Sequence, residues 1–105
     1  YRMTKALLEE GVDCTAIFAI SDSLAIGAVR ALIDAGKRVP MDISVAGFDG
    51  TEMAAYYNPS ITTIRQPAET MARETIKLLF DSIKKKTNVQ QLIFSLILLV
   101  LIHLQ

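Results

Sequence analysis

The chain has 105 residues, 51% of them hydrophobic, and its eleven basic and eleven acidic residues give a formal net charge of zero. This length suits one small domain with a modest core. The charge balance argues against a nucleic-acid-binding surface within these residues, because binding phosphates needs an excess of Lys and Arg. The single cysteine, Cys14, cannot form an internal disulfide, and no metal-ligand pattern surrounds it.

The first half of the chain predicts a helix followed by a strand–helix–strand unit. Residues 2–10 carry apolar side chains at helical spacing, and "TAIFAI" (15–20) predicts a buried strand. One of the polar residues at 21–23 is expected to cap a helix that runs to about Ala35. "DISVAGFD" (42–49) predicts a second strand. Two strands joined through a helix by short loops indicate a parallel sheet with a right-handed crossover.

The second half predicts one more strand and a long helix. Residues 50–59 read as a loop with a short helix, and "SITTIRQ" (60–66) predicts a third strand. Pro67 suits the first turn of an amphipathic helix that covers "AETMARETIKLLFDSIKKKT" (68–87). The order of these elements predicts the α/β class with a three-layer parallel-sheet subdomain.

The end of the chain differs from the rest in composition. Residues 92–102 are apolar except for Ser95 and carry neither charges nor alternation. The run is too short for a membrane span, which needs about 20 residues, so we expect no membrane partner. A fragment held at a membrane by residues 92–102 is a second alternative to the main interpretation below.

Enzymatic chemistry is not indicated by the motifs. The chain has neither a Gly-x-Gly-x-x-Gly nor a Walker pattern. Its only histidine, His103, belongs to the apolar end, so no histidine lies near Ser21 or Ser23 to act as a general base. The acidic residues are dispersed rather than clustered as metal ligands. We therefore expect no enzyme activity, no cofactor and no metal site.

Polar residues follow each predicted strand. Ser21 and Asp22 come after the first strand, Asp49 after the second, and Arg65 and Gln66 after the third. The carboxyl ends of parallel strands meet at one edge, where ligands bind in open α/β sheets. Taken singly, Asp22 suits a helix cap, and Asp49 before Gly50 suits a turn. Their convergence favours hydrogen bonding to a polyhydroxylated ligand.

Four sequence blocks in this order resemble one family. They are a strand ending in Ser-Asp, a helix with the Ala-x-Gly core "AIG", "VPMDISVAGFD" and "PSITTIRQP", all within residues 16–67. This part is similar to the carboxyl-terminal half of the effector domain of LacI/GalR-type bacterial repressors. The resemblance covers about residues 1–94, which would form the carboxyl-terminal subdomain. Residues 95–105 depart from the family pattern as an atypical hydrophobic tail.

The resemblance implies a sensor of two periplasmic-binding-protein-like subdomains preceded by a helix-turn-helix DNA reader. Asp49 matches the carboxylate that binds effector hydroxyls, Ser21 matches a polar cleft residue, and Gln66 occupies a position that can line the cleft. The implied partners are a small sugar or sugar derivative and operator DNA, the latter through a helix-turn-helix missing from this chain. The first alternative is a periplasmic sugar-binding protein of the same fold.

A homodimer is expected from the predicted helix at residues 22–35, which is apolar nearly all round. We expect the sheet to cover the face formed by Ala25, Ala28, Val29 and Leu32. Ile26 and Ile33 then point outward, and Tyr56 and Tyr57 in the following loop extend the same patch. The resemblance agrees, because subdomains of this family pair through this helix and loop.

The amino end of the sequence bears on the cellular location of the protein. It shows no signal peptide and no initiator Met. We therefore expect the chain to be part of a longer, cytoplasmic protein.

Overall fold

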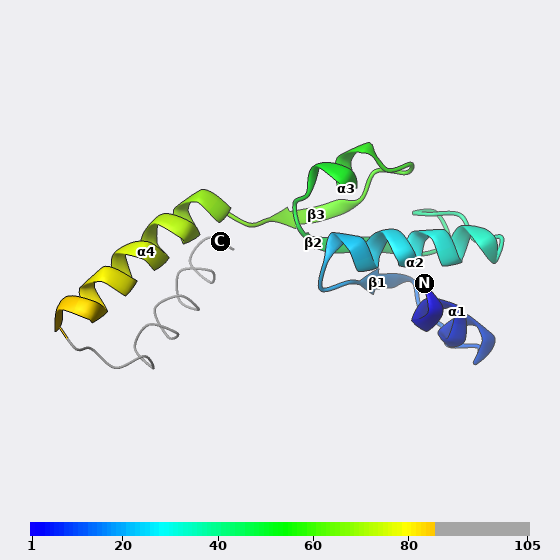
Figure 1. The fold of residues 1–105 in the computed structure, drawn as a ribbon. Coiled ribbons are helices and arrows are strands. Elements are labelled where there is room, and N and C mark those ends of the chain that lie inside the picture. Colours follow the sequence, from blue (N-terminus) through cyan, green and yellow to red (C-terminus); the bar gives the residue numbers. More distant parts are fainter. Residues whose placement is uncertain (86–105) are drawn as a thin grey trace. The chain divides into compact units, whose positions relative to one another are not determined.

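A computed structural model describes residues 1–85. The apolar run 92–102 and the predicted tail 95–105 lie outside the described residues. The chain divides into two units, Tyr1–Arg65 and a second that begins at Gln66. The first unit contains six elements, labelled in Figure 1: α1 (Arg2–Glu9), β1 (Ala16–Phe18), α2 (Asp22–Asp34), β2 (Ser44–Asp49), α3 (Glu52–Tyr56) and β3 (Thr62–Arg65).

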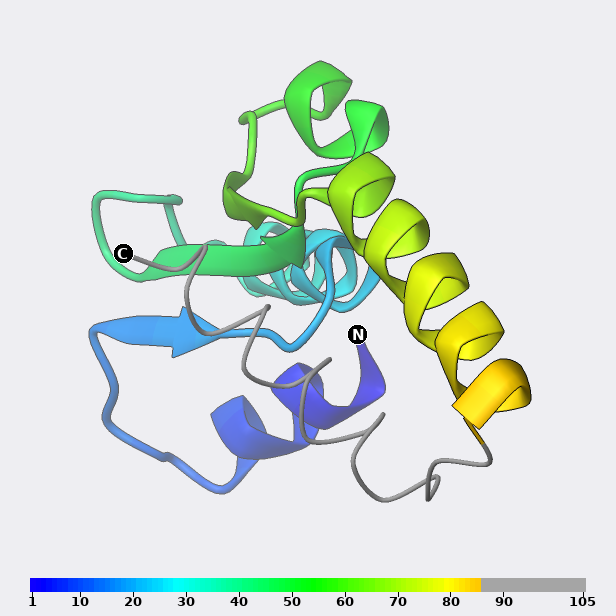
Figure 2. The ribbon, with the colours of Figure 1, turned by 90° about the vertical axis from the view of Figure 1, so that its left-hand side faces the viewer.

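The three strands form one parallel sheet in the order β1-β2-β3. Ile17 pairs with Val45 between the first two strands, and Asp49 pairs with Arg65 at the carboxyl end of the second pair. The arrowheads of β1 and β2 point the same way in Figure 2. The prediction of an α/β fold with a parallel sheet is therefore confirmed.

The observed strands are shorter than the predicted strands 15–20, 42–49 and 60–66, although β2 ends at Asp49 as predicted. β1 stops at Phe18, and only three residues later Ser21 caps α2. Backbone pairing continues slightly past the strand, since the Ala19 amide donates to the Ala46 carbonyl at 2.8 Å.

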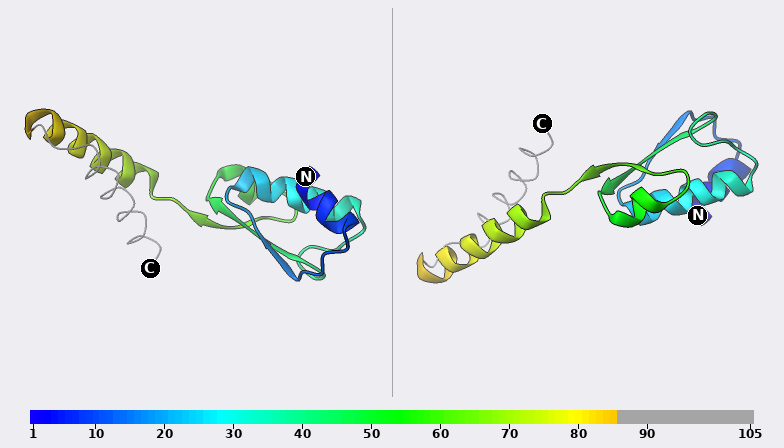
Figure 3. Two further views of the ribbon diagram at one scale, coloured as in Figure 1. Left: turned by 90° about the horizontal axis from the view of Figure 1, so that it is seen from below. Right: turned by 90° about the horizontal axis from the view of Figure 1, so that it is seen from above.

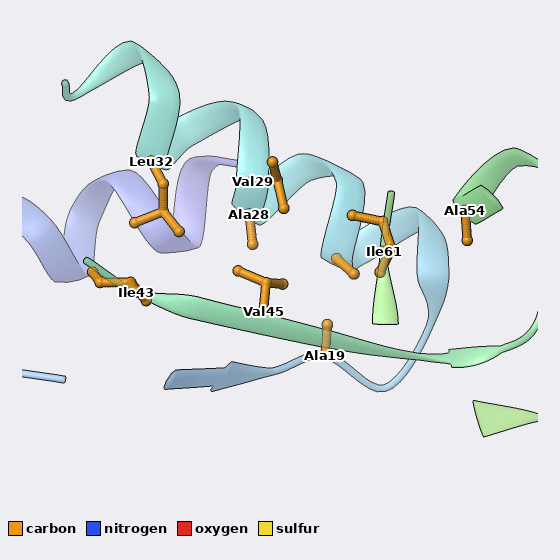
Figure 4. Close-up of a cluster of buried hydrophobic side chains, with 9 residues drawn as sticks. Ala19, Ala28, Val29, Leu32, Ile43, Val45, Ala54 and Ile61 are labelled. Atoms are coloured by element: carbon orange, nitrogen blue, oxygen red, sulfur yellow. The ribbon is translucent and has the colours of Figure 1, made fainter. Parts of the chain in front are cut away.

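The core lies between α2 and one face of the sheet. In Figure 4, Val45 and Ala19 point from the sheet toward α2, and Leu32 points back from the helix. The buried cluster consists of Ala19, Ala25, Ala28, Val29, Leu32, Ile43, Val45, Ala54 and Ile61. Helix α1 packs against α2 rather than on the far side of the strands, so both helices lie on one side of the sheet (Figure 3).

The other face of the sheet is uncovered within residues 1–65. Phe18 is 62% exposed on β1 and Ile64 is 43% exposed on β3, and strand alternation places both on this face. The prediction that residues 15–20 form a buried strand is wrong for this unit, because β1 is an edge strand with one face open. Residues 1–65 thus supply the sheet and one helix layer of the predicted three-layer fold.

The described part of the second unit is one long helix, α4 (Ala68–Lys85). Pro67 precedes it, as predicted, and its carbonyl accepts a hydrogen bond from the Met71 amide at 2.9 Å. Residues on its apolar stripe include Ile76, Leu79, Phe80 and Ile83, all exposed. Among the described helices, none combines the length and apolarity needed to cross a membrane.

Replacing Leu32 by Ala should destabilise the first unit strongly. Leu32 is fully buried in the core, so truncation leaves a cavity and should lower the free energy of unfolding by about 2–5 kcal/mol. Leu24→Ala on the same helix is the matched control, because Leu24 is 52% exposed. Urea unfolding of both variants measures the difference, and equal losses would contradict this account of the core.

The turn before β2 is closed by an ion pair between Arg38 and Asp42. The Arg38 side chain donates from Nη2 to Asp42 Oδ1 at 2.6 Å and from Nε to both carboxylate oxygens. The Arg38 amide also donates to Asp42 Oδ2 at 2.7 Å. These hydrogen bonds from Arg38 lower the pKa of Asp42 from 3.8 to about 2.

The ion pair of Asp42 should stabilise the fold at neutral pH and lose this effect in strong acid. Because the pKa of Asp42 is lowered by folding, its stabilisation is present above its unfolded value and is lost as pH falls from 3.8 toward about 2. The melting temperature of Asp42→Asn should therefore lie below that of wild type at neutral pH, and the gap should narrow at the acidic end. A gap that stays constant across this range would contradict the assignment.

Candidate functional site

Ser21 lies at the carboxyl end of β1 and begins α2. Its backbone is extended, and its hydroxyl oxygen accepts a hydrogen bond from the Leu24 amide at 3.3 Å. Serine is among the preferred residues at this capping position because it satisfies one of the free amides of the first turn. The prediction of a cap at residues 21–23 is thus resolved in favour of Ser21, a half-buried side chain at the edge predicted to bind ligand.

Asp49 is the last residue of β2 and lies at the same edge of the sheet. It is half-buried, and its φ of 122° is unusual for a residue other than glycine. Gly50 follows with φ of 72°, and a Cβ there would come within 2.5 Å of the Arg65 Cα. The chain therefore turns sharply against β3 directly after Asp49, and only glycine fits at the turn.

Asp22 is a completely buried carboxylate in the first turn of α2. Its Oδ2 accepts from the Thr51 amide at 2.6 Å and from the Thr51 hydroxyl at 2.9 Å. Its Oδ1 accepts from the Thr63 hydroxyl. The Thr63 oxygen in turn accepts from the Gly50 amide at 3.3 Å. Asp22 therefore links α2, the loop after β2, and β3.

The charge of Asp22 is retained in the core. Burial raises the pKa of its carboxyl group, but hydrogen bonds from Thr63 and Thr51, with a further contribution from the Gly50 amide, outweigh burial and hold the pKa below its ordinary value. A buried charge is costly unless hydrogen bonds replace the lost water. Its place at a helix amino terminus adds a favourable dipole interaction.

Gly47 makes room for this carboxylate. A Cβ on Gly47 would lie 2.6 Å from Asp22 Oδ1 and 3.2 Å from the Ala25 Cβ. The first turn of α2 can therefore approach the middle of β2 only because residue 47 has no side chain.

Arg65 and Gln66 follow β3 at its carboxyl end. Arg65 pairs with Asp49 in the sheet register and is exposed. Gln66 is the first residue of the second unit, so its place in the ligand site stays a prediction. The structure thus brings Ser21, Asp49 and Arg65 to one edge of the sheet in the first unit.

The predicted pairing surface combines α2 with the end of α3. Ile33 is 42% exposed and Tyr56 is 83% exposed, whereas Ile26 and Tyr57 are half-buried and pack partly against the core. Ile26 and Ile33 are seven residues apart and share one stripe of α2 with Arg30. The pKa of Arg30 is raised, first by its hydrogen bond to Asp34.

A groove between α1 and α2 is separate from the edge of the sheet at which Ser21 and Asp49 lie. Its volume is about 430 Å³, and none of the predicted ligand residues lines it. The lining residues are Tyr1, Lys5, Leu8, Glu9, Ala31, Asp34 and Ala35.

The polar side chains at the strand ends are suited to hydrogen bonding with a ligand. Within residues 1–85, no group of three or more His, Cys, Asp or Glu side chains could hold a metal ion. A carboxylate and a hydroxyl at the strand ends can accept and donate hydrogen bonds to ligand hydroxyl groups.

Sequence reasoning missed the buried network. It treated Asp22 as a cap or ligand contact, and it gave no role to Thr51 or Thr63. The one available signal was a Ser-Asp pair before a helix, and either residue of such a pair can cap.

Comparison with known proteins places the chain in a family. Residues 2–100 match the family model of the periplasmic binding protein-like domain. The transcriptional regulator MalR of Clostridium butyricum is 52% identical over 83 residues, which cover 79% of this chain and 25% of MalR. CelR of Thermobifida fusca is 40% identical over 84 residues, 80% of this chain and 25% of CelR. The chain therefore spans about a quarter of the length of these relatives.

Solved structures show the same fold. A CelR–cellobiose complex matches with a TM-score of 0.74 and 39% identity, covering 81% of this chain and 26% of that one. The lac repressor dimer bound to operator and an anti-inducer matches with a TM-score of 0.75 and 35% identity, covering 82% of this chain and 30% of the repressor. The chain belongs to the periplasmic-binding-protein-like domain family, in the branch represented by LacI-type transcriptional regulators.

Proposed function

We propose that this chain is the ligand-sensing carboxyl-terminal subdomain of a LacI-type regulator that binds a small sugar-like effector and controls transcription. The observation that carries the proposal is the Asp49 carboxylate, held at the tip of β2 beside the turn at Gly50. Ser21 adds a hydroxyl at the same edge, and Gln66 follows β3. The relatives MalR and CelR support a regulator over a periplasmic transport protein.

The complete protein would bind operator DNA through a segment outside this chain. Effector binding would shift the balance between two conformations that differ in operator affinity. The zero net charge of the chain agrees with a sensor rather than a DNA-contacting part. We place the regulator in the cytoplasm, with residues 1–94 as the subdomain and 95–105 as a distinct tail.

Replacing Asp49 by Ala in the complete protein should abolish the effector response and leave the fold intact. Loss of hydrogen bonds to a charged group costs about 1.5–3 kcal/mol, which weakens binding at least about tenfold. The probe is cellobiose, the ligand of the CelR complex, with maltose as a second sugar, and the measurement is isothermal titration calorimetry.

Asp13→Ala is the matched control for this experiment. Asp13 is an exposed carboxylate in the loop before β1, at the amino ends of the strands. Its variant should bind like wild type. Unchanged affinity of the Asp49 variant would remove Asp49 from the site.

We also propose that the regulator is a homodimer that pairs through α2 and the end of α3. The surface is defined by Ile26, Ile33, Tyr56 and Tyr57. Exposed apolar patches of this kind on soluble proteins mark interaction sites, and a two-fold contact would place the same patch on both partners. The solved lac repressor with operator is a dimer, which supports this assembly.

Ile26→Glu should convert the dimer to a monomer in sedimentation velocity, because it places an unpaired charge in an apolar interface. Since Ile26 also packs partly against the core, Ile33→Glu serves as a second variant on a more exposed position. Leu24→Glu is the control, as Leu24 is exposed on another side of α2. If both isoleucine variants sediment as unchanged dimers, the surface is misassigned.

A further inference from the structure

We propose that Asp22 is a positioning residue that fixes Asp49 and Ser21 relative to each other without contacting the effector. The proposal rests on the proposed function, since it concerns the same site. Its basis is the network of a fully buried carboxylate with hydrogen bonds to Thr51 and Thr63.

The network holds the loop that follows Asp49. The Gly50 amide is bound by the Thr63 hydroxyl oxygen at 3.3 Å, and the Thr51 amide is bound by Asp22 at 2.6 Å. Before this loop, Asp49 is paired with Arg65 in the sheet. Asp49 therefore sits between a strand ladder on one side and two anchored amides on the other, which keeps its backbone at φ of 122°. Such a conformation persists only where surrounding contacts determine it.

The same carboxylate anchors Ser21. Asp22 is the first residue of α2, and Ser21 caps that helix through the Leu24 amide. Any shift of the helix start relative to the loop at 49–51 must break a hydrogen bond of Asp22. The distance between the hydroxyl of Ser21 and the carboxylate of Asp49 is thus set by Asp22. Small errors in such spacing are costly for ligand recognition.

The donors around position 22 favour a carboxylate. Three donors converge on it: the Thr51 amide, the Thr51 hydroxyl and the Thr63 hydroxyl. A carboxylate has two acceptor oxygens, whereas an asparagine amide has one oxygen and a donor NH₂ group. In Asp22→Asn, the NH₂ group replaces one acceptor oxygen, so either the Thr51 amide faces a donor or the Thr63 hydroxyl can no longer donate to residue 22.

The sharpest test uses two adjacent threonines on β3. Thr63→Val removes the hydroxyl that joins Asp22 to Gly50 and keeps the side-chain shape. Thr62→Val is the matched control, because Thr62 is exposed and strand alternation points it to the opposite face. Thr63→Ser restores a hydroxyl and tests rescue. The experiment uses the complete protein and two readouts, cellobiose affinity and amide hydrogen exchange.

Thr63→Val should weaken cellobiose binding at least about tenfold. It should speed exchange at Gly50 and Thr51 while the Val45 amide near the start of β2 keeps its wild-type rate. Thr63→Ser and Thr62→Val should both behave like wild type. If the Asp22→Asn variant folds, it should show both weaker cellobiose binding and faster exchange at Gly50 and Thr51, each more strongly than Thr63→Val. If it does not fold, the threonine variants alone test the proposal.

Two outcomes are decisive against the proposal. If Thr63→Val exchanges at Gly50 and Thr51 as Thr62→Val does, Asp22 does not fix the loop. If exchange rises there but cellobiose affinity is unchanged, Asp22 has only a structural role. If wild type binds neither cellobiose nor maltose, the proposed sugar sensing fails in that class, and the exchange rates at Gly50 and Thr51 still decide whether the network holds Asp49.

Discussion

The hydrogen bonds of the buried Asp22 carboxylate hold together the edge of the sheet at which Ser21 and Asp49 lie. An ionised group in a core is tolerated only when its hydrogen bonds replace water, and here Thr51 and Thr63 supply them. These donors come from parts of the chain that are far from Asp22 in sequence. One side chain therefore fixes α2, the loop after β2 and β3 against one another, which apolar contacts alone would do less specifically.

Several features of the sequence follow from this constraint. Residue 47 must be glycine, because any Cβ there would collide with the Asp22 carboxylate. Thr51 has two tasks, since its hydroxyl donates to Asp22 and its oxygen accepts from the Ala54 amide as the cap of α3. The orientation of α3 is thereby tied to Asp22, and Ala54 is completely buried against the core.

The fold could be predicted well from the sequence, but the hydrogen-bond network around Asp22 could not. Apolar runs and helix periodicity report which segments are buried, so the parallel topology and the buried face of α2 (Ala25, Ala28, Val29 and Leu32) could be predicted and are confirmed. The exposure of Phe18 on β1 could not be predicted. Burial of an edge strand depends on which other segment covers the sheet, and the composition of the strand does not carry that information. The Asp22 network depends on contacts with Thr51, which is 29 positions away, and with Thr63, which is 41 positions away. No local sequence pattern encodes such contacts.

The residues proposed to contact the effector are adjacent in sequence to those that hold the scaffold, and Ser21 also belongs to the scaffold as the cap of α2. Ser21 precedes Asp22, and Asp49 precedes the anchored pair Gly50 and Thr51. Such neighbours can have different roles because the side chains of consecutive residues, both at the start of a helix and at the end of a strand, point in different directions. In the proposed function, Ser21 and Asp49 would determine ligand specificity, and the core behind them would determine how precisely they are held.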